Sequence, residues 1–239
     1  MKNTVKALVF TGLSLALNAY GLGVSPMLVY FNSGNNVQDL TVSNADNVVE
    51  YAQITLRSLQ SPGAENASVV TFQPGQSPQQ FGLMVSPNKL AVGPGGSRKI
   101  RLVNLAPHPK TDRIYTITVM NINPATKVVG TVKGSAADMN LTYGYQVQVF
   151  VLPDHPLPIV SAQRQGEKIT ITNQGNSYIS LRSGQVCDPH GYHCQSLPAD
   201  LNYHVLYAGS TWSFSLPHPG QVRYFGVYAA TQNMMVESN

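Results

Sequence analysis

Short segments in which apolar and polar residues alternate follow one another along most of the chain, separated by turn-forming residues about every ten positions. This alternation is typical of β-strands with one buried face, because successive side chains of a strand point to opposite sides. Residues 33–36 (SGNN) and 93–96 (GPGG) are examples of the intervening turns. No window of about 12 residues has a convincing helical period. The pattern predicts an all-β fold of the sandwich type.

The predicted strands form two blocks separated by a proline-rich segment. Residues 152–158 (LPDHPLP) hold three prolines, and proline cannot donate to a β-ladder, so we expect a stiff connector here. The expected units are a first domain over 22–152, a linker over 153–158 and a second domain over 159–239. The first block of predicted strands comprises 27–31, 39–43, 50–56, 81–85, 89–92, 98–104, 113–122 and 139–152, and the second comprises 168–173, 178–183, 203–207, 210–216 and 222–228.

The first residues differ from the rest of the chain. Lys2 and Lys6 precede an apolar run over 7–17, which is too short to span a bilayer and has the layout of a secretory signal. We expect a signal peptide over 1–21 that is cleaved after Gly21, with cleavage after Gly23 as the alternative. The other interpretation is a buried N-terminal helix. The prediction is therefore an exported protein whose mature chain does not insert into the membrane.

Export changes the interpretation of the two cysteines. Cys187 and Cys194 enclose a short turn-rich loop, CDPHGYHC, which favours a local disulfide in an oxidising compartment. The alternative is a metal site that adds His190 and His193 to the thiolates. Four ligands within eight residues would strain a tetrahedral shell, so we predict the disulfide and no metal.

Composition and motifs exclude several functions. Only 11% of residues are charged, against about 25% in an ordinary soluble domain. The fifteen Lys and Arg against eleven Asp and Glu give +4, which falls to +2 without residues 1–21, and they form no basic block, so nucleic-acid binding is not expected. The usual nucleophile, phosphate-binding and dinucleotide motifs are missing from the sequence. We therefore expect no enzyme and no cofactor.

One alternating run is much longer than the strand length of about 5 to 6 residues that is typical of proteins. Over 139–151 each odd position is apolar or aromatic, while the segment before it, 124–138, looks like a mobile loop. We expect 147–151 to be an ordinary core strand. The first half could project beyond the sandwich as an apolar edge that is kept for a partner. The odd positions are Met139, Leu141, Tyr143, Tyr145, Val147, Val149 and Val151.

Taken together, several segments resemble the periplasmic chaperones of the chaperone–usher pathway, in particular its non-classical branch. The resemblance covers nearly the whole mature chain, and its order and spacing are more specific than any single motif. It implies two immunoglobulin-like sandwiches set at an angle with a cleft between them. The segments that carry it are 23–31 (GVSPMLVYF), 40–44 (LTVSN), 86–104 (SPNKLAVGPGGSRKIRLVN), 113–124 (RIYTITVMNINP), 139–153 and 167–184 (EKITITNQGNSYISLRSG).

The resemblance also implies a mechanism, donor-strand complementation, in which a long strand of the chaperone completes an unfinished pilin fold. It places Met139, Leu141 and Tyr143 at the donor positions, with Tyr145 as a fourth candidate. The implied partners are pilin or fimbrial subunits and an outer-membrane usher, and the implied compartment is the periplasm. Free chaperones could also cap the strand by self-association.

One part of the family pattern is missing. The positions that match the family's basic anchor for the subunit's C-terminal carboxylate are Leu28 and Gln148, which carry no charge. A buried carboxylate still needs cationic donors. The substitute that we favour from the alternation of residues 98–102 is Arg101, followed by Arg113 and Arg57. The alternative function of the whole chain is that of a secreted β-sandwich fimbrial subunit or adhesin.

Overall fold

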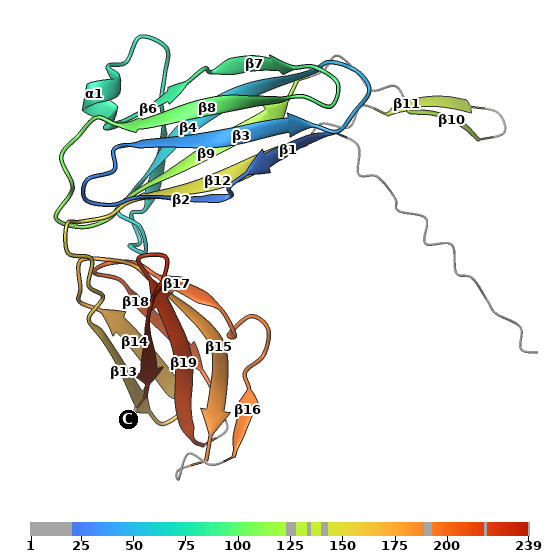
Figure 1. Cartoon of the computed structure of the whole chain (residues 1–239). Coiled ribbons are helices and arrows are strands. Elements are labelled where there is room, and N and C mark those ends of the chain that lie inside the picture. Colours follow the sequence, from blue (N-terminus) through green and yellow to red (C-terminus); the bar gives the residue numbers. More distant parts are fainter. Residues whose placement is uncertain are drawn as a thin grey trace, which may run out of the picture.

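The computed structural model describes residues 21–122, 128–132, 135–139, 143–188, 193–217 and 219–238. Strands dominate these ranges, and the only helix among them is the single turn α1 (Pro78–Phe81). Figure 1 shows two β-sandwiches set at an angle, which we call the N-terminal and the C-terminal sandwich. The predicted all-β fold is confirmed.

The N-terminal sandwich consists of two facing sheets. The first sheet has the order β1-β3-β8-β6, and the second has the order β2-β12-β9-β4-β5 with β7 also paired to β4. Strand β2 runs parallel to β12, whereas the other pairs are antiparallel. The strands of the first sheet are β1 (Leu22–Ser25), β3 (Val37–Asn44), β8 (Ser97–Asn104) and β6 (Leu83–Ser86), and those of the second are β2 (Leu28–Phe31), β12 (Gly144–Val151), β9 (Arg113–Asn121), β4 (Glu50–Gln60), β5 (Ser68–Thr71) and β7 (Lys89–Val92).

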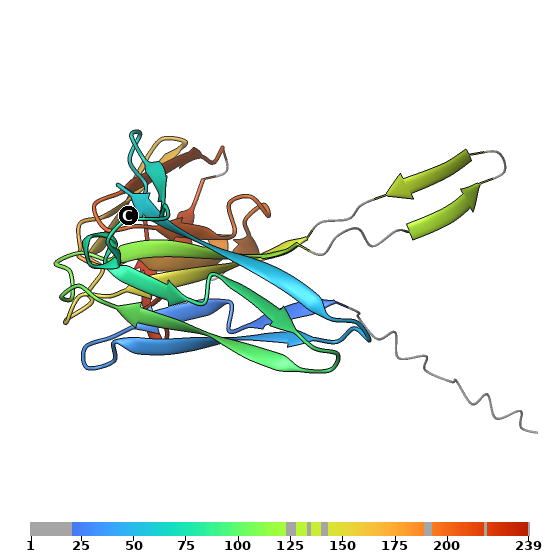
Figure 2. The same cartoon turned by 90° about the horizontal axis from the view of Figure 1, so that it is seen from above.

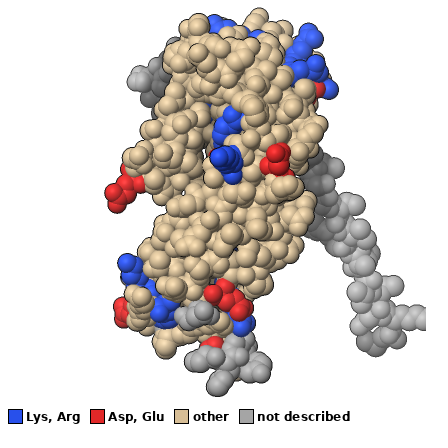
Figure 3. Space-filling model, turned by 90° about the vertical axis from the view of Figure 1, so that its left-hand side faces the viewer, with Lys and Arg blue, Asp and Glu red and all other residues tan. Residues whose placement is uncertain are grey.

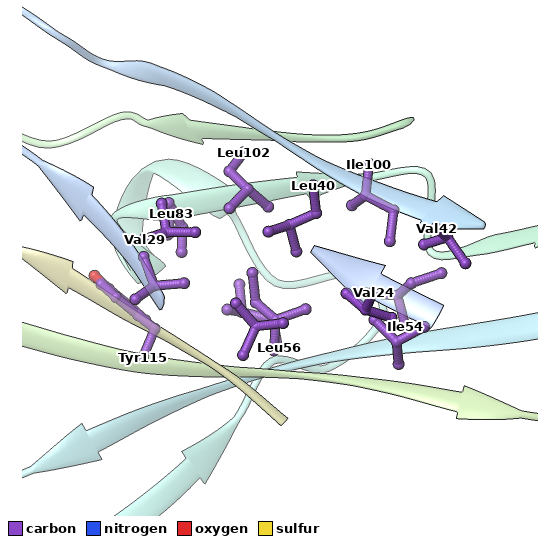
Figure 4. Packing of buried hydrophobic residues seen from close by; sticks show 14 of the residues in the cluster. Val24, Val29, Leu40, Val42, Ile54, Leu56, Leu83, Ile100, Leu102 and Tyr115 are labelled. Atoms are coloured by element: carbon purple, nitrogen blue, oxygen red, sulfur yellow. The ribbon is translucent and has the colours of Figure 1, made fainter. Parts of the chain in front are cut away.

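The core of this sandwich follows from the alternation in the sequence. Inward side chains from both sheets, among them Leu40, Ile100 and Leu56, meet between the sheets (Figure 4). Val147 and Val149 of β12 have no exposed surface. The expectation of an ordinary core strand over 147–151 is thus confirmed. Burial of side chains of this kind contributes about 1.5–3 kcal/mol each to folding.

The C-terminal sandwich is smaller and also has two sheets. One has the order β13-β14-β18, and the other has the order β16-β15-β19-β20 with β17 paired to β15. Buried side chains such as Ile171, Leu181 and Tyr224 fill the space between them. The strands are β13 (Val160–Gln165), β14 (Lys168–Asn173), β18 (Thr211–Ser215), β16 (Cys194–Ser196), β15 (Ile179–Cys187), β19 (Gln221–Tyr228), β20 (Gln232–Glu237) and β17 (His204–Leu206).

Cys187 and Cys194 form the predicted disulfide, with an S–S distance of 2.03 Å, where β15 pairs with β16. His190, which belonged to the alternative metal site, lies outside the described residues. Among the described residues no three His, Cys, Asp or Glu side chains are grouped so as to hold a metal ion. The single helical turn found in the same ranges is far too short to cross a bilayer.

The sandwiches touch each other through an aromatic contact. The ring of Tyr178, from the C-terminal sandwich, stacks on Phe150 with centroids 4.3 Å apart, and its hydroxyl donates to the hydroxyl of Tyr30 at 2.7 Å. Asp112 adds a polar contact, because its carboxylate accepts the backbone N–H of Tyr178 at 2.5 Å and the hydroxyl of Ser177 at 3.1 Å. Apolar stacking and a charge-assisted hydrogen bond therefore hold the two sandwiches together.

The expectation of one strand over 139–152 is wrong. Met139 ends strand β11 (Ser135–Met139), which pairs with β10 (Val128–Val132) in a separate ribbon that extends from the N-terminal sandwich (Figures 1 and 2). The segment 124–138, expected to be a loop, therefore contains a hairpin. The alternation shows which residues share a face, but it does not show which strand pairs with which, and β-branched residues at 128–132 supply a local partner.

Other differences concern short elements. Phe81, expected at the start of a strand, ends α1, because Pro78 favours the first position of a helical turn and Gly82 (φ 88°) closes it in the left-handed conformation. The prediction missed several short strands at sheet edges, which are β1, β5, β10, β13, β16 and β20. Of these, β13, β16 and β20 are rich in polar residues.

Candidate functional site

Strand β12 has an edge that is only partly covered. It pairs with β9 over its whole length, from Gly144 to Val151, but with β2 only from Gln148 onward. The N–H of Gln148 donates to the carbonyl of Met27 at 3.0 Å. Because alternate residues of a strand direct their N–H and C=O to the same side, those of Gly144 and Gln146 point to this same edge. In the described part of the chain no strand pairs with them there.

The side chains at this end of β12 are aromatic. Tyr143 and Tyr145 continue the inward face of Val147 and pack, half-buried, against the core of the N-terminal sandwich. Their rings meet edge to face, with centroids 6.4 Å apart. The hydroxyl of Tyr145 donates to the carbonyl of Leu22 at 2.6 Å, and the hydroxyl of Tyr143 accepts the N–H of Leu22 at 2.8 Å. The two tyrosines thus close one end of the sandwich.

Of the four residues expected at donor positions, the structure brings these two tyrosines together. Met139 lies at the end of β11, and Leu141 lies outside the described residues. The assignment of all four as donor residues stays a prediction. What the structure adds is the neighbouring open edge at Gly144 and Gln146.

Two polar residues that the sequence analysis did not single out complete this end of the sandwich. The side-chain amide of Asn121 donates to the carboxylate of Glu50 at 2.5 Å and to the hydroxyl of Tyr143 at 3.1 Å. Glu50 is only 4% exposed. The sequence does contain a signal for both residues, because each is a polar residue at a position where the alternation predicts a buried side chain. Glu50 stands two residues before the buried Ala52, and Asn121 stands two residues after the buried Val119.

The outer face of the second sheet carries a row of four residues that pair across four strands. Register places Leu28 beside Gln148, Gln148 beside Thr116 and Thr116 beside Arg57. Arg57 is half-buried. Because neighbouring strands lie about 4.8 Å apart and Thr116 stands between them, the Cα atoms of Arg57 and Gln148 are about 10 Å apart. Arg57 therefore shares a row with Leu28 and Gln148, the two uncharged residues at the positions where the sequence resemblance implied a basic anchor.

Next to this row lies the contact between the sandwiches. Phe150 and Tyr30 follow Gln148 and Leu28 at two residues' distance, on the same outward side, and both rings stack with Tyr178. Arg57 thus lies on the sheet face that turns toward the C-terminal sandwich.

The other two basic candidates lie elsewhere. Arg101 projects from the outer face of the opposite sheet, where its Nε lies 3.1 Å from the carboxylate of Asp39, with Lys99 at 3.3 Å from the same group. The hydrogen bonds from Arg101 and Lys99 lower the pKa of Asp39. This pairing makes Arg101 part of a solvated surface cluster rather than a neighbour of β12.

Arg113 lies at the junction of the sandwiches. Its Nη2 donates to the carbonyl of Pro107 at 2.8 Å and to the side chain of Asn104 at 3.3 Å. It lines a hollow of about 520 Å³ together with Asp112 and, from the C-terminal sandwich, Tyr207. Figure 3 shows one face of the molecule, with Lys and Arg side chains in a hollow near the junction and uncharged residues over most of the surface.

The fold was compared with known proteins. No protein-family model matches the sequence, and no curated protein matches it either. Solved structures do match. The class 5 fimbriae chaperone CfaA has a TM-score of 0.66 and 17% identity, over 92% of this chain and 99% of that one. The E. coli chaperone DraB has a TM-score of 0.62 and 20% identity, over 92% and 96%.

A third match is the complex of the Salmonella enterica SafA pilin with the SafB chaperone, with a TM-score of 0.62 and 14% identity over 93% of this chain and 97% of that one. The sheets and these matches show a β-protein with two immunoglobulin-like sandwiches. More narrowly, it has the fold of the chaperones of fimbrial assembly. The resemblance noted in the sequence is confirmed at the level of the fold.

Proposed function

We propose that this protein is a periplasmic chaperone that binds fimbrial or pilus subunits by donor-strand complementation and delivers them to an outer-membrane usher. The observation that carries the proposal is the open edge of β12 at Gly144 and Gln146, which follows directly on an apolar alternating segment. A strand edge of this kind can pair with a strand of another protein. The fold shared with CfaA and with the SafB complex supports the same function.

In this proposal the backbone and the side chains of the segment have separate roles. The free N–H and C=O groups at the edge extend the ladder to a strand of the subunit, while alternate side chains enter the subunit's open core. Met139 and Leu141 are proposed as the residues that fill the pockets of this core, and Tyr143 and Tyr145 as the part of the donor segment that lies next to the open edge. Each apolar side chain that is fully buried in this way contributes about 1.5–3 kcal/mol.

We further propose that Arg57 is the cation that binds the C-terminal carboxylate of the subunit. It lies in the row of Leu28 and Gln148, and within the described residues its side chain has no hydrogen bond or ion pair. A guanidinium that is half-buried and unpaired is suited to a bidentate carboxylate contact. Arg101 is less suited, because Asp39 already neutralises it.

The proposal also includes the signal peptide, the compartment and the two folding units that the sequence predicts. Residues 1–21 act as a cleaved signal peptide, and the disulfide fits an oxidising compartment such as the periplasm. Residues 22–152 and 159–239 form two folding units around the linker 153–158. The matched structures are chaperones by name, so we assign no enzymatic activity to the chain.

The test is co-expression with a pilin-like subunit, followed by co-purification from the periplasm. Met139→Glu with Leu141→Glu should abolish the complex, because two charges would have to enter an apolar groove. The matched control is Val37→Glu, since Val37 is 48% exposed on the opposite sheet. A complex that survives the double substitution would refute the donor-strand assignment.

A further inference from the structure

Two tyrosine hydroxyls enclose the backbone of one residue at the end of the N-terminal sandwich. Leu22 donates its N–H to Tyr143 and accepts a hydrogen bond from Tyr145 at its carbonyl. Leu22 opens β1, which belongs to the first sheet, whereas the tyrosines stand at the start of β12 in the second sheet. These bonds therefore join the two sheets where the chain enters β12.

A buried polar chain supports one of the two tyrosines. Asn121 lies between the carboxylate of Glu50 and the hydroxyl of Tyr143, and its backbone N–H also donates to the carbonyl of Tyr143 at 3.0 Å. Together with the bond from the Leu22 N–H, three hydrogen bonds thus fix the position of Tyr143. Satisfied networks of this kind make a local structure rigid.

The alternation in the sequence gives Tyr143 and Tyr145 the same role as Met139 and Leu141, whereas the hydrogen bonds of the two tyrosines indicate a different one. A side chain that fills a pocket in a partner has to leave its own domain, whereas these hydroxyls are bonded to their own chain. We propose that Tyr143 and Tyr145 are positioning residues, whose hydroxyls hold the start of β12 on β1 and so fix the direction of the donor segment before a subunit arrives. Pocket filling then falls to Met139 and Leu141. This inference rests on the proposed function.

The physical consequence is pre-organisation. A segment that already points in its binding direction loses less conformational freedom on association. If the segment is loosened, only the fraction of molecules that hold it in the right arrangement can bind the subunit. Removing the hydroxyls should therefore slow capture of the subunit and leave its release almost unchanged.

The experiment uses the full mature chain with Tyr143→Phe and Tyr145→Phe combined. Phenylalanine keeps the ring, so packing and pocket filling are retained and only the hydroxyl bonds are lost. Amide hydrogen exchange of the free protein should become about tenfold faster at residues 23–25 and at residues 145 and 147, which pair with neighbouring strands, given the size of the two lost hydrogen bonds to Leu22. Exchange in β14 should not change. The association rate with the subunit should fall by a similar factor, about tenfold.

The control is Tyr203→Phe, because Tyr203 is 54% exposed in the C-terminal sandwich. Unchanged exchange in the double variant would overturn the inference, and so would faster exchange with an unchanged association rate. Slower capture without faster exchange would also overturn it, since the hydroxyls would then act on the subunit directly. If the wild-type chain captures no subunit at all, the proposed function fails, whereas the exchange measurement still tests the contact with Leu22.

Discussion

Arg57 and Gln148 lie in one row on the outer face of the second sheet, with Thr116 between them. They come from strands far apart in the sequence, and only the register of β4, β9 and β12 brings them together. The row ends at Leu28, beside the aromatic contact that joins the two sandwiches. The positive charge of Arg57 thus lies in the same row as the two uncharged residues Leu28 and Gln148.

Replacing Arg57 with alanine should weaken subunit capture. The loss of a charge-assisted hydrogen bond corresponds to about 1.5–3 kcal/mol, or about a 10- to 100-fold rise in Kd. Arg57→Lys should restore only part of the affinity, because lysine lacks the bidentate geometry. Binding to an immobilised subunit measures the effect.

Arg101→Ala is the matched control, and we expect it to leave capture intact because Arg101 is paired with Asp39 on the opposite sheet. A subunit with an amidated C-terminus should bind the wild type and Arg57→Ala equally. Loss of capture with Arg101→Ala and not with Arg57→Ala would reverse the assignment.

Stability should depend on pH through Asp112. Burial between the sandwiches raises the pKa of Asp112 to about 6, although the bonds from Tyr178 and Ser177 favour its ionised form and oppose the rise. The folded chain therefore binds this proton more tightly than the unfolded chain, in which the pKa is about 3.9. The stabilisation from this proton is full below about pH 4 and is lost as pH rises through about 6.

The measurement is urea unfolding of the wild type and of Asp112→Asn between pH 4 and pH 7.5. Relative to the non-titrating variant, the wild type should lose up to about 3 kcal/mol over this range. Parallel curves for the two proteins would show that Asp112 has an ordinary pKa. A wild type that gains stability with rising pH would show that the hydrogen bonds from Tyr178 and Ser177 outweigh the burial.

The sequence predicted the sandwich class and much of its core because alternation identifies the buried face of a strand. Ile54 and Leu56 in β4, and Val147 and Val149 in β12, are buried as this rule requires. Alternation does not identify which strands pair with each other. Residues 124–138 were therefore expected to form a loop and 139–152 one long strand, whereas the structure has the paired strands β10 and β11 over 128–139. Edge strands such as β13 and β20 were missed because polar residues there weaken the pattern.

The candidate site was predictable only in part. Tyr143 and Tyr145 were found because they continue an apolar phase, but their hydrogen bonds to Leu22 depend on how two sheets close over each other. The hydrogen-bonded chain of Glu50, Asn121 and Tyr143 was harder to predict, because the only sign of it in the sequence is that two polar residues occupy positions where buried side chains are expected. The preference for Arg101 came from alternation within one strand, which does not show that Asp39 faces it across a ladder.

Breaking the disulfide should destabilise the C-terminal sandwich and leave subunit capture intact. Closing so short a loop between Cys187 and Cys194 corresponds to about 2–3 kcal/mol in the chain-entropy treatment. Cys187→Ser with Cys194→Ser should lower the unfolding midpoint of that sandwich, as calorimetry or urea unfolding would show. Capture should persist, because the open edge of β12 belongs to the other sandwich. A capture defect at a temperature where the variant is folded would contradict this separation.

Finally, the mature chain should keep Leu22 and therefore be cleaved after Gly21 or earlier. Cleavage after Gly23 would remove half of β1, including the pairing of Leu22 with Asn44 and both hydrogen bonds to the tyrosines. Cleavage after Gly21 preserves them, because the amine of Leu22 is a hydrogen-bond donor just as its amide is. N-terminal sequencing or intact-mass measurement of the mature protein decides between the two. A mature chain that begins at Val24 and still captures subunits would show that neither tyrosine needs Leu22.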